Sequence, residues 1–200
     1  DLFLEPLRFD ALTGRINWRR HDADWKVDVA QLKFNNPDVA ASLSGSYTSA
    51  SAGAGLADLR AELIKARADA VWRYIPLTVG DTTRNWLRSS LKSGTADRAE
   101  MVLRGALDDF PWDKKKTGQF RVDVDAHDVD LDYADHWPFI SRIGAKLVFE
   151  GDQLLIHANQ GNIMGVRLTK VQAQIPSLER GERLVLDGEL HGPLLNYLRF

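Results

Sequence analysis

The sequence contains no cysteine, and this absence removes several kinds of chemistry at once. Disulfide bonds, thiolate zinc sites and cysteine nucleophiles are all excluded. Long apolar runs are missing as well, because no stretch approaches the roughly 18 uninterrupted apolar residues that a membrane-spanning helix needs. Residues 1–20 lack the charged and then apolar order of a signal peptide. We therefore expect any anchor or export signal of this protein to lie outside these residues.

Net charge of one sign is also missing. The chain of 200 residues carries 26 basic and 28 acidic side chains, which gives a formal charge of −2, and the two signs are interleaved. Nucleic-acid-binding proteins concentrate lysine and arginine on one face, so no nucleic-acid partner is expected. Because 44% of the residues are hydrophobic, the chain has enough apolar side chains to fold. Apolar residues also stand at both ends, which favours a single segment, residues 1–200, cut from a longer protein at both ends.

Alternation of apolar and polar residues is the dominant pattern. Successive side chains of a β-strand point to opposite faces, so this alternation predicts strands with one apolar face. In the longest run, Phe120, Val122, Val124 and Ala126 alternate with charged residues, and the phase then shifts by one residue before Val129. Such a shift predicts a β-bulge. Further alternating runs lie at 15–19, 25–30, 39–47, 56–63, 101–108, 145–149, 153–158, 164–175 and 183–190.

Two short helices interrupt the strands, at about residues 67–75 and 82–92. The first ends at Pro76. Asp81 is the expected N-cap of the second, which carries Trp86, Leu87 and Leu91 and is expected to stop at Gly94. The fold class is therefore mainly β, a long twisted antiparallel sheet that forms an open groove, with two short helices.

No constellation for catalysis or metal binding emerges. The acidic run from Asp123 to Asp132 lies on the polar face of one strand, which is the pattern of a solvated sheet face. The histidines stand singly, without the helical spacing that binds zinc. We therefore expect no enzyme activity, no cofactor and no metal. Two aromatic clusters with proline, at 110–112 and 137–139, are interpreted as corners where strands end, with stacking platforms for a ligand as the alternative.

Several groups of residues together carry a family likeness. They are PLRFDALTG at 6–14, VAASLSG at 39–45, RYIPL at 73–77, WLRSSL at 86–91, VLRGALDDFP at 102–111, LDYADHWP at 131–138 and GNIMGV at 161–166. In these groups the sequence resembles the central region of the YhdP-like branch of the AsmA-like proteins of Gram-negative bacteria. The resemblance covers most of the chain and contains no catalytic motif.

The resemblance implies a periplasmic segment of a protein anchored in the inner membrane. In that family the body is a long β-sheet groove, similar to bridge-like lipid transfer proteins, that helps move phospholipid between the inner and outer membranes and so maintains the outer-membrane barrier. The implied partners are phospholipid acyl chains, and membranes through parts outside this segment. We expect ten apolar residues to line the groove: Leu103, Val122, Val124, Leu131, Leu147, Phe149, Leu154, Ile156, Val166 and Leu168.

Two other functions remain open from the sequence. A closed β-sandwich with a dry core, acting as a structural or interaction module, would produce the same alternation. A glycan-binding β-domain would use the aspartates and tryptophans as its site.

Overall fold

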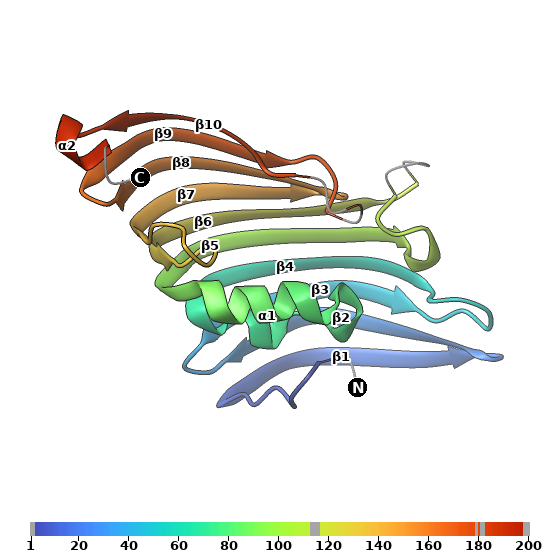
Figure 1. The fold of residues 1–200 in the computed structure, drawn as a ribbon. Helices are drawn as coiled ribbons and strands as arrows, with labels where there is room; N and C mark the ends of the chain where they lie inside the picture. The colour runs from blue at the N-terminus through green and yellow to red at the C-terminus, as the bar shows by residue number, and fades with distance from the viewer. Residues whose placement is uncertain (1–2, 113–116, 179, 181–182, 198–200) are drawn as a thin grey trace.

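Ten strands form one antiparallel sheet, in which each strand pairs with the strand that follows it in the chain (Figure 1). The computed structural model describes residues 3–112, 117–178, 180 and 183–197, so the outermost residues at both ends lie outside the description. The strands are β1 (Ala11–His21), β2 (Asp24–Asn35), β3 (Val39–Thr48), β4 (Leu56–Arg67), β5 (Leu91–Ala106), β6 (Gln119–Leu131), β7 (Ile140–Glu150), β8 (Gln153–Ile163), β9 (Val166–Ile175) and β10 (Val185–His191). The mainly β fold predicted from the sequence is confirmed.

The sheet does not close. Its two edges are β1 and β10, and in the described residues each of these strands pairs with one neighbour only. A closed β-sandwich needs two sheets packed face to face. All ten strands belong to a single sheet, so the sandwich does not describe this chain.

The helical segments are short. They are η1 (Ala68–Tyr74), η2 (Leu77–Val79), α1 (Asp81–Ser90), η3 (Leu107–Asp109) and α2 (Leu194–Tyr197), of which η1, η2 and η3 are 3-10 helices. The two helices predicted at 67–75 and 82–92 correspond to η1 and α1. The second prediction ran two residues too far, because Leu91 already pairs with Leu131 of the neighbouring strand. Gly94, the predicted stop, lies inside β5.

The predicted N-cap of α1 is wrong. Gly80 is the N-cap, with φ of 89°, and Asp81 is the first helical residue. The Asp81 carboxylate accepts a hydrogen bond from Arg84 Nη1 at 2.5 Å and caps no backbone N–H. A positive φ favours glycine, which explains why the chain enters the helix one residue earlier than the aspartate indicated.

The predicted bulge in the longest strand is confirmed. Register shifts occur between Ala126 and Val129, and Asp128 has φ of 50°. Comparable shifts occur in other strand pairs, at Val29/Leu32, Ala40/Ala41, Ala96/Arg98, Ser141/Gly144 and Glu189/Leu190. A bulge bends its strand and increases the local twist. The repeated bulges accompany the bend that the strands share in Figure 1.

Both aromatic clusters with proline lie in connections between strands, and the first forms a buried corner. Trp112 is 3% exposed, and its Nε1 donates a hydrogen bond to the carbonyl of Ala106 at 2.8 Å. A Cβ on Gly118 would lie 2.3 Å from an atom of the Trp112 ring, so only glycine fits beneath the indole. The second cluster, at 137–139, also lies where strands end, between β6 and β7, but Trp137 is 66% exposed and touches Tyr133 edge to face.

Candidate functional site, an apolar sheet face

Facing residues on neighbouring strands continue one apolar row across the whole sheet. In an antiparallel pair, directly opposed residues lie on the same face, so the pairings can be followed from strand to strand. One row is apolar on all ten strands and runs Leu12, Phe34, Ala41, Leu63, Ala99, Val124, Leu147, Ile156, Ala173 and Leu186. At about 4.8 Å per strand gap, this row is about 43 Å long.

Neighbouring rows on the same face are also apolar. A second row crosses nine strands as Gly14, Leu32, Leu43, Ala61, Met101, Val122, Phe149, Leu154 and Ile175. A third joins Leu91, Leu131, Ile140, Ile163 and Val166. We call the surface formed by these rows the apolar face.

Small side chains form a further row on the apolar face. It runs Val39, Ala66, Ala96, Ala126, Ala145, Ala158, Val171 and Gly188, beside rows of larger residues. Several bulges lie next to this row, which therefore follows the line where the sheet bends. Small side chains project less far from the backbone than the larger ones in the neighbouring rows.

The structure places the ten predicted groove residues together on the apolar face. Val122, Phe149 and Leu154 share one row, and Val124, Leu147 and Ile156 share another. The remaining four are on β5, β6 and β9, so the ten residues lie on the five strands β5–β9. Nine of the ten are half-buried. Val166 is 0% exposed, because it packs against the backbone at Gly192, and so it has no surface for a ligand.

Sequence reasoning left out the part of the apolar face that β1–β4 and β10 provide. Phe34, Leu63 and Leu186 belong to the ten-strand row but were not among the predicted groove residues. Their strands show the same alternation, so the signal that found the other residues was available for them too.

The opposite face is polar, and several of its charged side chains form ion pairs. Arg104 contacts Asp58 at 3.1 Å and Lys146 contacts Asp125 at 3.7 Å. Two hydrogen bonds join Arg121 to Asp123 at 2.7 Å, and the first cause of the raised pKa of Arg121 is this hydrogen bonding. Within the described residues, no group of three or more histidine or acidic side chains could hold a metal ion.

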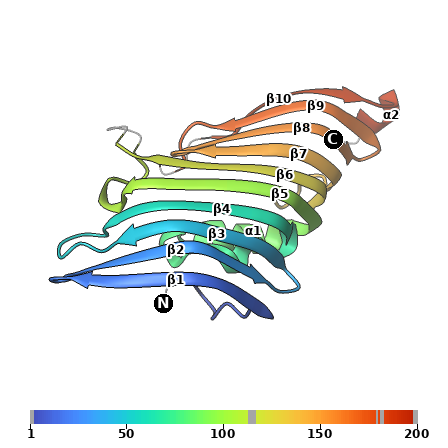
Figure 2. The ribbon, with the colours of Figure 1, turned by 180° about the vertical axis from the view of Figure 1, so that it is seen from behind.

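Two helices lie against the apolar face. Figure 1 shows η1 and α1 in front of the strands β2 to β4, and Figure 2 shows them behind the same strands. Val39 and Ala41 on the apolar face are each 7% exposed here, whereas Lys65, which faces Ala40 on the polar side, is exposed. We call residues 68–90 the flap.

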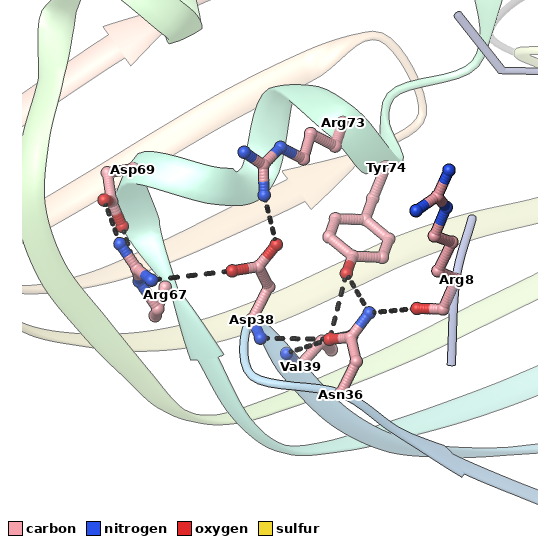
Figure 3. A network of polar contacts seen from close by, with 8 residues as sticks. All are labelled: Arg8, Asn36, Asp38, Val39, Arg67, Asp69, Arg73 and Tyr74. Atoms are coloured by element: carbon pink, nitrogen blue, oxygen red, sulfur yellow. Dashed lines mark hydrogen bonds and ion pairs between the residues drawn. The ribbon is translucent and has the colours of Figure 1, made fainter. Parts of the chain in front are cut away.

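A polar network fastens the flap to the turn between β2 and β3 (Figure 3). Asn36 Nδ2 donates to the carbonyl of Arg8 at 2.7 Å and to Tyr74 Oη at 2.9 Å. Asn36 Oδ1 accepts from the backbone N–H of Asp38 and of Val39, at 3.0 and 2.9 Å. One side chain therefore joins the N-terminal segment, the turn and η1.

Ion pairs complete this network. Arg73 Nη1 lies 2.6 Å from Asp38 Oδ2, and Arg67 Nη1 lies 3.6 Å from Asp38 Oδ1. On its far side, the flap is held by Trp86, whose Nε1 donates to the carbonyl of Tyr133 at 3.0 Å. The flap is thus attached to two turns at the same end of the sheet.

The fold and the site together define this chain as an open, single-layer antiparallel sheet with one continuous apolar face. The chain belongs to the YhdP family, whose model, described as "YhdP protein", matches residues 1–200. Over 193 residues it is 25% identical to the intermembrane phospholipid transporter YhdP of Escherichia coli (strain K12), a match that covers 96% of this chain and 15% of that protein. No solved structure matches it. Among the described residues, none of the helices has the length and apolar character to cross a membrane.

Proposed function

We propose that this chain is part of the periplasmic body of a phospholipid transporter and carries acyl chains on its apolar face. In this proposal the full protein is anchored in the inner membrane and moves phospholipid between the inner and outer membranes, which maintains the outer-membrane barrier. The segment acts by binding and not by catalysis. The observation that carries the proposal is the row of apolar residues that continues across all ten strands.

Exposed apolar residues on the two edge strands support the proposal that acyl chains cover the apolar face. Leu12 on β1 and Leu186 on β10 are 60% and 63% exposed, although both belong to the ten-strand row. Extended exposed apolar surfaces mark binding sites. Each buried methylene contributes about 0.8 kcal/mol, so an acyl chain of about sixteen carbons would gain on the order of 12 kcal/mol on this face. Burial of this size needs no directed chemistry.

The glycan-binding alternative is not favoured by the arrangement of its residues. That site would need aspartates and tryptophans on the same surface. Asp123 and Asp125 pair with basic residues on the polar face, whereas Trp18 and Trp25 lie on the apolar face.

Site-specific photo-crosslinking in the full-length protein tests the proposal. A photoreactive residue at position 124 or 156 is expected to capture phospholipid in cells, because both positions lie on the apolar face. Positions 123 and 157 are the matched controls, since each adjoins a test position in the same strand and points to the other face. Equal capture from both faces, or no capture from either, would contradict the proposal.

A further inference from the structure

Arginine side chains stack on tryptophan at both ends of the strands that form the apolar face. The guanidinium carbon of Arg20 lies 5.7 Å from the centre of the Trp25 ring, and that of Arg88 lies 4.7 Å from the centre of the Trp72 ring. Arg20 is at the β1–β2 turn, and Arg88 is in the last turn of α1. In a meander, the β1–β2 turn and the β4–β5 connection lie at opposite ends of the strands, so the two arginines mark opposite rims.

Arg20 belongs to the apolar face by its register. Arg20 faces Trp25 and Trp18 faces Val27, and residues two apart on a strand share a face. Val27 in turn faces Tyr47, so Trp18, Trp25 and Tyr47 lie on the same face as Arg20 near this rim. Trp18 and Trp25 are 66% and 45% exposed. Exposed tryptophan and tyrosine beside an apolar surface are typical of the boundary between hydrocarbon and water.

Stacking leaves the donors of these guanidinium groups available. A guanidinium on an aromatic ring uses its flat face, while its N–H groups point outward in the plane of the fork. Arg20 Nε donates to the carbonyl of Asp22 at 3.0 Å, which leaves both Nη groups. Ion pairs between described residues do not include Arg20 or Arg88, although Arg19 pairs with Asp28 at 3.1 Å. A planar fork of free donors matches the oxygens of a phosphate group.

We propose that Arg20 and Arg88, each stacked on a tryptophan at a rim of the apolar face, bind the phosphate of the lipids whose acyl chains that face carries. This inference rests on the proposed function. An acyl chain on the apolar rows brings its headgroup to a rim, where the polar group returns to water. The ligand is a phosphate diester attached to acyl chains, and the headgroup beyond the phosphate makes no part of the contact.

Binding of two lipids that differ only in the phosphate tests the inference. The full-length protein is titrated with phosphatidylglycerol and with diacylglycerol of the same acyl chains. The double variant Arg20→Gln with Arg88→Gln is expected to bind phosphatidylglycerol about tenfold more weakly and diacylglycerol as tightly as the wild type does. Arg19→Gln is the matched control, because it removes the neighbouring cation from the opposite face, and its affinities should not change.

The other possible results distinguish a failure of this inference from a failure of the proposed function. If the double variant loses affinity for both lipids equally, or for neither, the phosphate contact is wrong while the acyl-binding face stands. If the wild type binds neither lipid, the proposed function itself fails. If inorganic phosphate at millimolar concentration displaces phosphatidylglycerol, the site serves a free anion and the inference is overturned.

Discussion

At the scale of the single residue, Tyr74 connects the flap to the sheet, and the pKa of its phenol depends on that contact. Burial opposes the charged phenolate, so the pKa of Tyr74 is raised from its ordinary value of 10.0, while the hydrogen bond with Asn36 acts in the opposite direction. At a pH between 10.0 and this raised pKa, the folded protein therefore keeps the Tyr74 proton, whereas the unfolded chain has mostly lost it. The resulting stabilisation is fully present below pH 10.0 and disappears as the pH rises through the raised pKa.

The raised pKa of Tyr74 makes the stability of the folded protein depend on pH in a direction that can be measured. Between about pH 9 and about pH 11, the free energy of unfolding should fall more steeply for the wild type than for Tyr74→Phe. Urea unfolding at a series of pH values measures both slopes, and the difference cancels the contributions of the other tyrosines and the lysines. Identical slopes would show that Tyr74 titrates in the folded protein as it does in the unfolded chain.

At the scale of the element, the flap depends on Asn36 for its position. Asn36→Ala leaves the carbonyl of Arg8 and the backbone N–H groups of Asp38 and Val39 without their side-chain partner. We expect a loss of about 1–3 kcal/mol, since the part-buried backbone N–H groups of Asp38 and Val39 lose their hydrogen bonds. Hydrogen exchange of the peptides that cover 36–41 and 68–74 should become faster in the variant.

The control for this prediction is Asn17→Ala, which removes an exposed amide from the polar face of β1. Its effect should stay within about 0.5 kcal/mol. If Asn36→Ala leaves hydrogen exchange of the flap unchanged, the ion pairs of Asp38 hold the flap without Asn36.

At the scale of the whole molecule, an open apolar face and a dry core respond differently to a buried charge. Val124→Asp places a carboxylate in the middle of the ten-strand row, where it would meet acyl chains at a cost of several kcal/mol. On an open face, water can reach this carboxylate when lipid is absent. We therefore expect lipid movement in cells to be lost while the folded protein persists, as measured by lipid content and by resistance to proteolysis.

Val102→Asp is the matched control for this prediction. Val102 is half-buried like Val124 but lies on the polar face, where it faces Arg60 and Arg121. A carboxylate between two arginines should be tolerated, and lipid movement should be unchanged. Complete unfolding of the Val124 variant alone would indicate that this position is in a closed core.

The sequence predicted the sheet because alternation is a local property of the chain. The phase shift between Ala126 and Val129 was readable for the same reason, and so was the common face of Val122, Val124 and Leu147. The start of α1 was not readable, because Gly80 and Asp81 offer competing signals and only the backbone conformation separates them. The end of α1 was hidden as well, because pairing of Leu91 with Leu131 overrides the helical pattern.

Alternation by itself determined that one face of each strand is apolar and that these faces add up to a surface. Whether that surface is closed by a second sheet was decided by the tertiary structure alone, because alternation does not show which strands share a sheet or whether the sheet folds back on itself. The register of the β1–β2 hairpin placed Arg20 opposite Trp25 on the apolar face, and the fold of the flap placed Arg88 over Trp72. Strand register and contacts between individual side chains leave no period in the sequence, so only the three-dimensional structure could show them.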